Sequence, residues 1–208
     1  RYRALAASGR LEISTTPHTH PLAPLLIDFA SAREAEPHAA LPVANCYPGG
    51  RARTTAQIES AMTSHAARFA AAPAGVWPAE GAVSDAFLKL LDSGGCRWTA
   101  ASESVLAASL RHGTPQLPPR EQYLYRPYGL ACAPGITMFF RDEKLSDLIG
   151  FEYRHWHGKD AAADFVARLH AIRREVPAGE TAVVTVILDG ENAWEHYPYN
   201  GYYFFDDL

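Results

Sequence analysis

Residues 182–188, with the sequence AVVTVIL, give the clearest strand signal in the chain, and Asp189 and Gly190 follow them directly. An apolar, β-branched run that ends at a turn signal predicts a buried strand. The nearly all-apolar run ITMFF at residues 136–140 predicts a second one. Shorter runs predict three further strands, at residues 11–16, 75–78 and 96–100.

Segments with helical periodicity separate these strands. Apolar residues at helical spacing predict helices over residues 54–71, 83–91, 103–110, 145–151 and 160–175, the last capped by Asp160. Alternation of strands and helices predicts an α/β fold with a parallel sheet covered by helices, either open or closed into a barrel. In both cases the chemistry is expected at the carboxyl ends of the strands.

Composition bounds the class of protein. The chain has 208 residues, 48% of them hydrophobic, which suits one globular domain. Its 19 Lys and Arg against 23 Asp and Glu give 19 − 23 = −4, so we expect no nucleic-acid partner. No apolar run approaches the roughly 20 residues that span a bilayer, so we expect no membrane partner either.

The cysteines and the chain ends carry further expectations. Cys46, Cys96 and Cys132 lie far apart with no CxxC spacing, which favours a reducing, cytoplasmic setting over a disulfide framework. Arg1 stands where an initiator Met or a signal peptide is expected, and residues 202–208 read as a helix that stops in mid-pattern. We therefore expect residues 1–208 to be a single catalytic domain, or a fragment of one, truncated at both ends.

Two carboxylates stand directly after predicted strands. Glu80 follows residues 75–79, and Asp189 follows residues 183–188. If both strands belong to one sheet, the two carboxylates converge and can act as acid, base or nucleophile on a glycosidic bond. The alternative is that Glu80 starts a helix, where its charge favours the helix dipole, and that Asp189 is a turn residue.

Two histidines follow the first predicted strand. His18 and His20 lie two residues apart, but no third ligand stands at a recognisable spacing. We therefore expect no metal ion at this site, and we favour a contact between His20 and a substrate hydroxyl.

Four strings resemble successive motifs of the family 57 glycoside hydrolases. They are RLEISTTPHTHP at residues 10–21, GVWPAEGAVS at 75–84, FFRDEKLSDLIGF at 139–151 and ILDGENAWE at 187–195. The resemblance covers nearly the whole chain and is closest to the α-amylase, amylopullulanase and α-mannosidase-like branch.

This resemblance implies a distorted, parallel-stranded (β/α)7-type barrel and a retaining enzyme acting on α-glucans without a metal or organic cofactor. It makes Glu80 the nucleophile and Asp189 the general acid/base, with carboxyl groups about 5–5.5 Å apart. It also implies seven substrate-binding residues, namely His20, Glu12, Trp77, Arg141, Asp142, Glu191 and Trp194.

Other interpretations remain open at this point. The two tryptophans can be core residues, and Arg141 with Asp142 can form an internal ion pair. The sequence lacks the family's first His-Gln-Pro type motif and has fewer than seven predicted strands, so we expect an incomplete barrel. Other functions include a 4-α-glucanotransferase on the same site, a metal-dependent polysaccharide deacetylase and a non-catalytic glycan-binding fragment.

Overall fold

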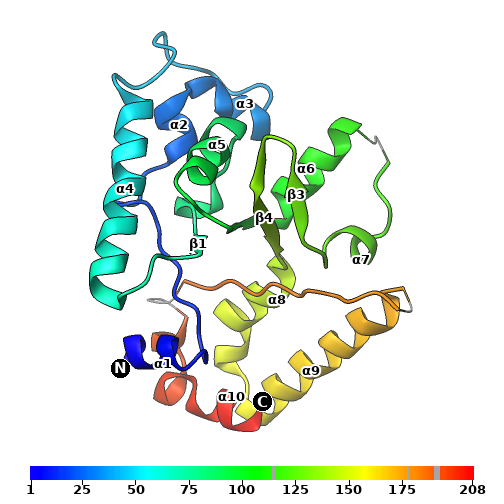
Figure 1. The fold of residues 1–208 in the computed structure, drawn as a ribbon. Helices are drawn as coiled ribbons and strands as arrows, with labels where there is room; N and C mark the ends of the chain where they lie inside the picture. Colours follow the sequence, from blue (N-terminus) through cyan, green and yellow to red (C-terminus); the bar gives the residue numbers. More distant parts are fainter. Residues whose placement is uncertain (114–115, 178, 190–192) are drawn as a thin grey trace. The chain divides into compact units, whose positions relative to one another are not determined.

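The computed structural model describes residues 1–113, 116–177, 179–189 and 193–208. The chain forms two compact units, shown in Figure 1. The first comprises Arg1–Ala101 and Pro127–Phe139, and the second comprises Ser102–Arg126 and Phe140–Leu208.

A four-stranded sheet with the order β1-β2-β4-β3 organises the first unit. Its strands are β1 (Gly75–Val76), β2 (Trp98–Ser102), β3 (Tyr128–Leu130) and β4 (Ala133–Arg141), the last residues of β2 and β4 belonging to the second unit. β1 and β2 are parallel, as predicted. The α/β class is confirmed, whereas the seven-stranded barrel stays a prediction.

The sheet is not parallel throughout, because it ends in β3, a strand that was not predicted from the sequence. β3 pairs with β4 in the antiparallel direction, and the register shifts between Gly129 and Leu130. The physical reason is the connection of two residues between the strands, because a tight hairpin can join only antiparallel neighbours.

The predicted strand at residues 11–16 is also wrong as a strand. Only Thr15 pairs, through one parallel bridge to Val76. The Thr15 amide donates to Gly75, the Trp77 amide donates to Thr15, and Pro17 follows without an amide proton to extend the ladder.

Helices make up much of the rest of the first unit. They are α1 (Tyr2–Ala7), α2 (Ala23–Ile27), α3 (Ala32–Ala35), α4 (Gly50–Phe69) and α5 (Asp85–Ser93), with 3-10 turns at Phe29–Ser31 and Ala79–Gly81. α2 contacts both α4 and α5. Gly50 allows the α2–α4 contact, because a Cβ there would lie 1.6 Å from the Leu26 carbonyl oxygen.

The core of the first unit contains residues from both the helices and the sheet. It contains Ala23, Ile58, Val76, Phe87, Leu88, Leu91, Cys96, Ala133 and Ile136. The predicted helices 54–71 and 83–91 are confirmed as α4 and α5, and their apolar stripes supply much of this core.

The second unit is mainly helical. It contains α6 (Glu103–Gly113), α7 (Arg120–Tyr123), α8 (Glu143–Asp147), α9 (Gly158–Glu175) and α10 (Tyr202–Asp207), a π turn at Leu148–Glu152 and 3-10 turns at Tyr153–His155, Trp194–His196 and Pro198–Gly201. α9 packs against α10, as Figure 1 shows. The core around them is rich in aromatic residues, including Tyr153, Tyr197 and Phe204.

Two sequence predictions for the second unit need correction. Asp160 does not cap α9, because His157 is the N-cap and Asp160 lies in the first turn. Residues 182–188 form no regular strand and are half-buried, with a single parallel bridge from Thr185 to Arg141. The neighbouring ladder stops because β4 ends at Arg141 and the chain turns into α8.

Candidate active site

Glu80 lies in a short turn after β1. Its backbone is left-handed, with φ 55° and ψ 19°, and the next residue, Gly81, is also left-handed. A non-glycine residue in this region costs about 1–3 kcal/mol, and such strain is found preferentially at functional sites. Ala79 and Gly81 are buried on either side, whereas the Glu80 side chain is 74% exposed. The buried neighbours therefore anchor the turn and leave the carboxylate accessible.

His20 is the hydrogen-bonding partner of Glu80. Its Nε2 lies 3.3 Å from Glu80 Oε1, and its Nδ1 lies 3.4 Å from Thr16 Oγ1. If Nε2 carries the proton and donates to Glu80, Nδ1 accepts from the Thr16 hydroxyl. Thr19 and His20 are themselves left-handed, with φ 62° and 53°. Both residues of this pair, and Thr19 beside His20, therefore have strained backbones.

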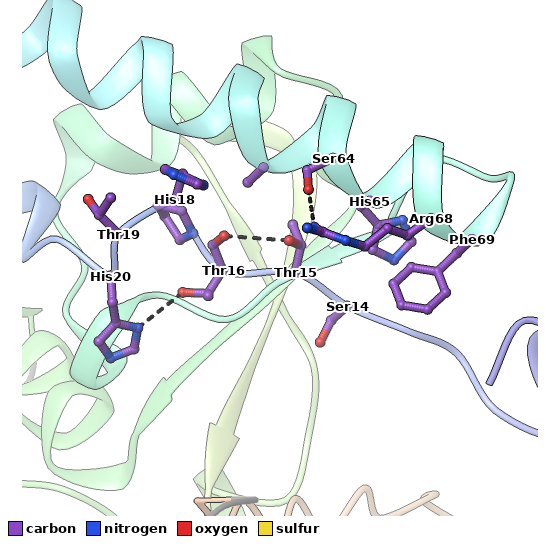
Figure 2. Close-up of a pocket in the computed structure, with 12 residues that line it drawn as sticks. Ser14, Thr15, Thr16, His18, Thr19, His20, Ser64, His65, Arg68 and Phe69 are labelled. Atoms are coloured by element: carbon purple, nitrogen blue, oxygen red, sulfur yellow. Dashed lines mark hydrogen bonds between the residues drawn. The ribbon is translucent and has the colours of Figure 1, made fainter. Parts of the chain in front are cut away.

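A cavity of about 350 Å³ adjoins His20 in the first unit. Figure 2 shows it between the segment from Ser14 to His20 and the α4 helix. Hydroxyl, imidazole and guanidinium groups line it together with one aromatic ring, that of Phe69. Buried His65 fixes its wall, with Nε2 2.9 Å from the Ile13 carbonyl and Nδ1 2.9 Å from the Ala71 carbonyl.

The other predicted residues of the first unit have partners within the protein. The exposed Glu12 carboxylate accepts a hydrogen bond from the indole of Trp98. Trp77 is partly buried, and a Cβ at position 81 would lie 3.2 Å from its ring. Gly81 therefore lets the turn that carries Glu80 pack onto Trp77.

Asp142 lies at the centre of a buried network in the second unit. It is 1% exposed and accepts hydrogen bonds from Arg120 at 2.7 Å, Tyr125 at 2.8 Å and the Leu145 amide at 2.9 Å. Burial opposes ionisation, but the bonds from Arg120, Leu145 and Tyr125 outweigh it and hold the pKa of Asp142 below its ordinary value. Every one of these donors is a protein group, so Asp142 acts as an N-cap and ion-pair residue.

Sequence analysis missed Arg120, which connects the network. Its guanidinium forms a two-pronged ion pair with Glu103 and also binds Asp142. Burial disfavours its charge, yet the bonds to Glu103 and Asp142 raise the pKa of Arg120 above its ordinary value. The position of Glu103 directly after β2 was the available signal for one half of this pair.

Arg141 is the last residue of β4 and has two partners within the second unit. Its Nε donates to the Ile187 carbonyl at 3.0 Å, and its terminal nitrogen lies 2.6 Å from Asp147 Oδ1. Arg141 therefore forms an internal ion pair, but its partner is Asp147 and not Asp142, which pairs with Arg120.

The remaining predicted residues follow the half-buried segment 182–188. Asp189 is exposed, and its carbonyl accepts from the Ala193 amide at 3.0 Å. Glu191 lies outside the described residues. Trp194 packs in an aromatic cluster, with its ring 4.5 Å from that of Phe205 and 5.2 Å from that of Tyr197.

The structure thus brings His20 and Glu80 together in the first unit. It places Arg141, Asp142 and the segment before Asp189 together in the second unit. Because Glu80 and Asp189 belong to different units, their pairing stays a prediction.

Within the described part of the chain, no group of three or more His, Cys, Asp or Glu residues is arranged to hold a metal ion. None of the described helices is long and apolar enough to cross a membrane.

Chemistry in α/β folds is expected where strands end, and Glu80 is an exposed carboxylate on a strained turn that follows β1. The chain belongs to glycosyl hydrolase family 57, whose family model matches residues 1–208. The search of curated proteins finds no match.

Solved structures of similar fold agree with this assignment. A family 57 branching enzyme from Pyrococcus horikoshii is 16% identical with a TM-score of 0.70, over 100% of this chain and 43% of that one. The α-amylase AmyC from Thermotoga maritima is 16% identical with a TM-score of 0.68, over 99% of this chain and 46% of that one. A 4-α-glucanotransferase from Thermococcus litoralis is 20% identical with a TM-score of 0.58, over 98% of this chain and 25% of that one. The chain spans less than half the length of each, and at these identities the likeness concerns the fold.

Proposed function

We propose that this chain is part of a retaining enzyme that cleaves or transfers α-glucans through a covalent glycosyl-enzyme. The observation that carries the proposal is the strained, exposed Glu80 bound to His20 in a chain of glycosyl hydrolase family 57. The three similar structures are named as a branching enzyme, an amylase and a 4-α-glucanotransferase, all of which act on α-glucans. A seven-stranded barrel completed by further chain belongs to the same proposal, as does the cytoplasmic setting favoured by three free cysteines.

In the proposed reaction Glu80 attacks the anomeric carbon while Asp189 protonates the departing glycosidic oxygen. Asp189 then removes a proton from water or from a sugar hydroxyl, and this oxygen displaces Glu80 from the anomeric carbon. The hydrogen bond from His20 orients the Glu80 carboxylate before attack. The cavity beside His20 offers hydroxyl partners for a sugar in Thr16 and Ser64.

Hydrolase and transferase differ only in what intercepts the glycosyl-enzyme. If water does so, the products are shorter glucans, and if a sugar hydroxyl does so, longer or branched glucans also form. The similar structures include a protein named as an amylase and two named as a branching enzyme and a 4-α-glucanotransferase, so transfer is the second candidate function. No described ligand cluster favours the deacetylase interpretation.

The test is incubation of the full-length protein with maltoheptaose and with pullulan, the products being separated by size. Proton NMR of the first product gives its anomeric configuration. We expect cleavage or transfer with the α configuration retained. A first product in the β configuration, or unchanged substrate in both incubations, would refute the proposal.

A further inference from the structure

Hydrogen bonds to the backbone hold every second residue of the segment 183–187, which leads to Asp189. The Val183 amide donates to the Tyr125 carbonyl at 3.0 Å, and the Thr185 carbonyl accepts from the Asp142 amide at 2.8 Å. Two residues further on, both backbone groups of Ile187 are bonded, in this case by side chains.

Ser146 takes the place of a missing ladder hydrogen bond. In a parallel ladder that contains the Asp142–Thr185 bond, the Ile187 amide would next donate to the Asp142 carbonyl. Here the Ile187 amide donates to Ser146 Oγ at 3.2 Å, and the Ser146 hydroxyl donates to the Asp142 carbonyl at 2.6 Å. The hydroxyl therefore connects the two groups where β4 has ended and α8 begins.

Arg141 holds the other backbone group of the same residue. Its Nε donates to the Ile187 carbonyl at 3.0 Å, while Asp147 fixes its guanidinium from the opposite end. Ser146 has no exposed surface, so bulk solvent does not reach its hydroxyl. A serine in a helix often bonds back to the carbonyl four residues earlier, but accepting from Ile187 as well is an additional function.

We propose that Ser146 and Arg141 are positioning residues for Asp189, the acid/base of the proposed function on which this inference rests. Ile187 lies two residues before Asp189, so a shift of its backbone is transmitted to the Asp189 carboxyl group. A displacement of about 1 Å at a reacting group can cost on the order of 100-fold in rate. The bonds at Ile187 restrict such displacements where the regular ladder no longer does.

The test compares two substrates in the full-length protein. An aryl α-glycoside with an acidic leaving group needs little protonation, whereas a maltooligosaccharide needs a well-placed acid. For Ser146→Ala we expect kcat/KM on the maltooligosaccharide to fall roughly 10- to 100-fold, and kcat/KM on the aryl glycoside to fall much less. Because kcat/KM reports the step that forms the glycosyl-enzyme, the later role of Asp189 as a base does not obscure the difference.

Two further variants keep the proposal falsifiable. Arg141→Lys retains the charge beside Asp147 but loses the fork that reaches Ile187, so it should show the same substrate difference even if Ser146→Ala fails to fold. Tyr153→Phe is the control in the same unit, because it removes only a hydrogen bond to Asp164 at 2.6 Å. Its effect, if any, should be equal on both substrates.

The Asp189→Asn variant distinguishes a failure of the positioning proposal from a failure of the acid/base role of Asp189. If it shows the substrate difference while Ser146→Ala and Arg141→Lys lower both substrates equally or leave both unchanged, positioning is wrong and the proposed function stands. If Asp189→Asn itself affects both substrates equally, Asp189 is not the acid, and the positioning proposal falls together with the acid/base role of Asp189, whereas the role of Glu80 is tested by its own variant.

Discussion

Glu80 and Asp142 are two acidic residues that follow strands, and their surroundings differ in almost every respect. The Glu80 side chain is 74% exposed, has one side-chain partner and lies on a strained backbone. The Asp142 side chain is 1% exposed and bonds to Arg120, Tyr125 and the start of α8. A carboxylate whose lone pairs are already bonded to protein donors stabilises the fold, whereas one that is anchored yet free can react. The strand-end position alone does not separate these two cases.

The largest effect is expected when the Glu80 side chain loses its charge. Glu80→Gln keeps the shape of the side chain and removes the charge, so the anomeric carbon loses its nucleophile. We expect kcat on maltoheptaose in the full-length protein to fall by about 10³-fold or more, with sugar binding nearly intact. Binding by calorimetry and kcat measured on the same preparation check this, and wild-type activity would make the assignment of Glu80 wrong.

The second prediction concerns the buried network around Asp142. Arg120→Met removes the partner of Glu103 and Asp142 and leaves two carboxylates without their charge partner. We expect the free energy of unfolding to fall by about 3–5 kcal/mol, because an uncompensated buried charge is costly. Urea unfolding measures it.

A matched arginine provides the control for this variant. Arg126 lies 4.0 Å from Glu180, and both side chains are about half exposed. Arg126→Met should therefore cost at most about 1 kcal/mol. Equal losses for the two variants would show that the buried network is no more important than a surface pair.

The third prediction is the pH dependence of stability that Asp142 creates. Its folded-state pKa is lowered, so the unfolded chain binds more protons than the folded one between the two pKa values. The stabilisation is fully present above the ordinary aspartate pKa of about 3.9 and is lost as pH falls through the lower folded value. Asp142→Asn should be less stable at pH 7 and lose less stability between pH 5 and pH 2, both read from unfolding curves. Parallel curves for the two proteins would contradict this.

Part of the fold and of the candidate site can be predicted from local patterns in the sequence. The apolar stripe of α4 and the Ser84 cap of α5 are encoded within single helices, and the strand-end position of Glu80 is visible as a polar residue after a short apolar run. By contrast, the Arg120–Glu103 pair joins residues 17 apart that meet only through tertiary packing. No periodicity reports such a contact.

The segment 182–188 shows where local patterns mislead. Its β-branched residues have the preference of a buried strand, but a ladder needs a neighbour that continues alongside. β4 ends at Arg141, so only Thr185 forms a bridge, and side chains bond to Ile187 instead. The hairpin partner β3 was missed for a related reason, since its three residues are too few to give a periodic signal.

The smallest effect is expected when the backbone strain at Glu80 is relieved. Its φ of 55° costs an L-residue about 1–2 kcal/mol, whereas glycine adopts this region freely at an entropic cost of about 0.5–1 kcal/mol. Glu80→Gly should therefore raise the free energy of unfolding by about 0.5–1 kcal/mol while abolishing activity. Glu80→Ala is the control, because it removes the same carboxylate and keeps the strained backbone, so it should bring no such gain. Equal stability of the glycine and alanine variants in urea unfolding would mean that the turn stores no strain. Asp142 offers no comparable gain, because its backbone has φ −71° and every change there removes a bonded carboxylate. Of these two acidic residues, only Glu80 should give a gain in stability when glycine replaces it, which is the behaviour expected where a fold maintains a strained residue for chemistry.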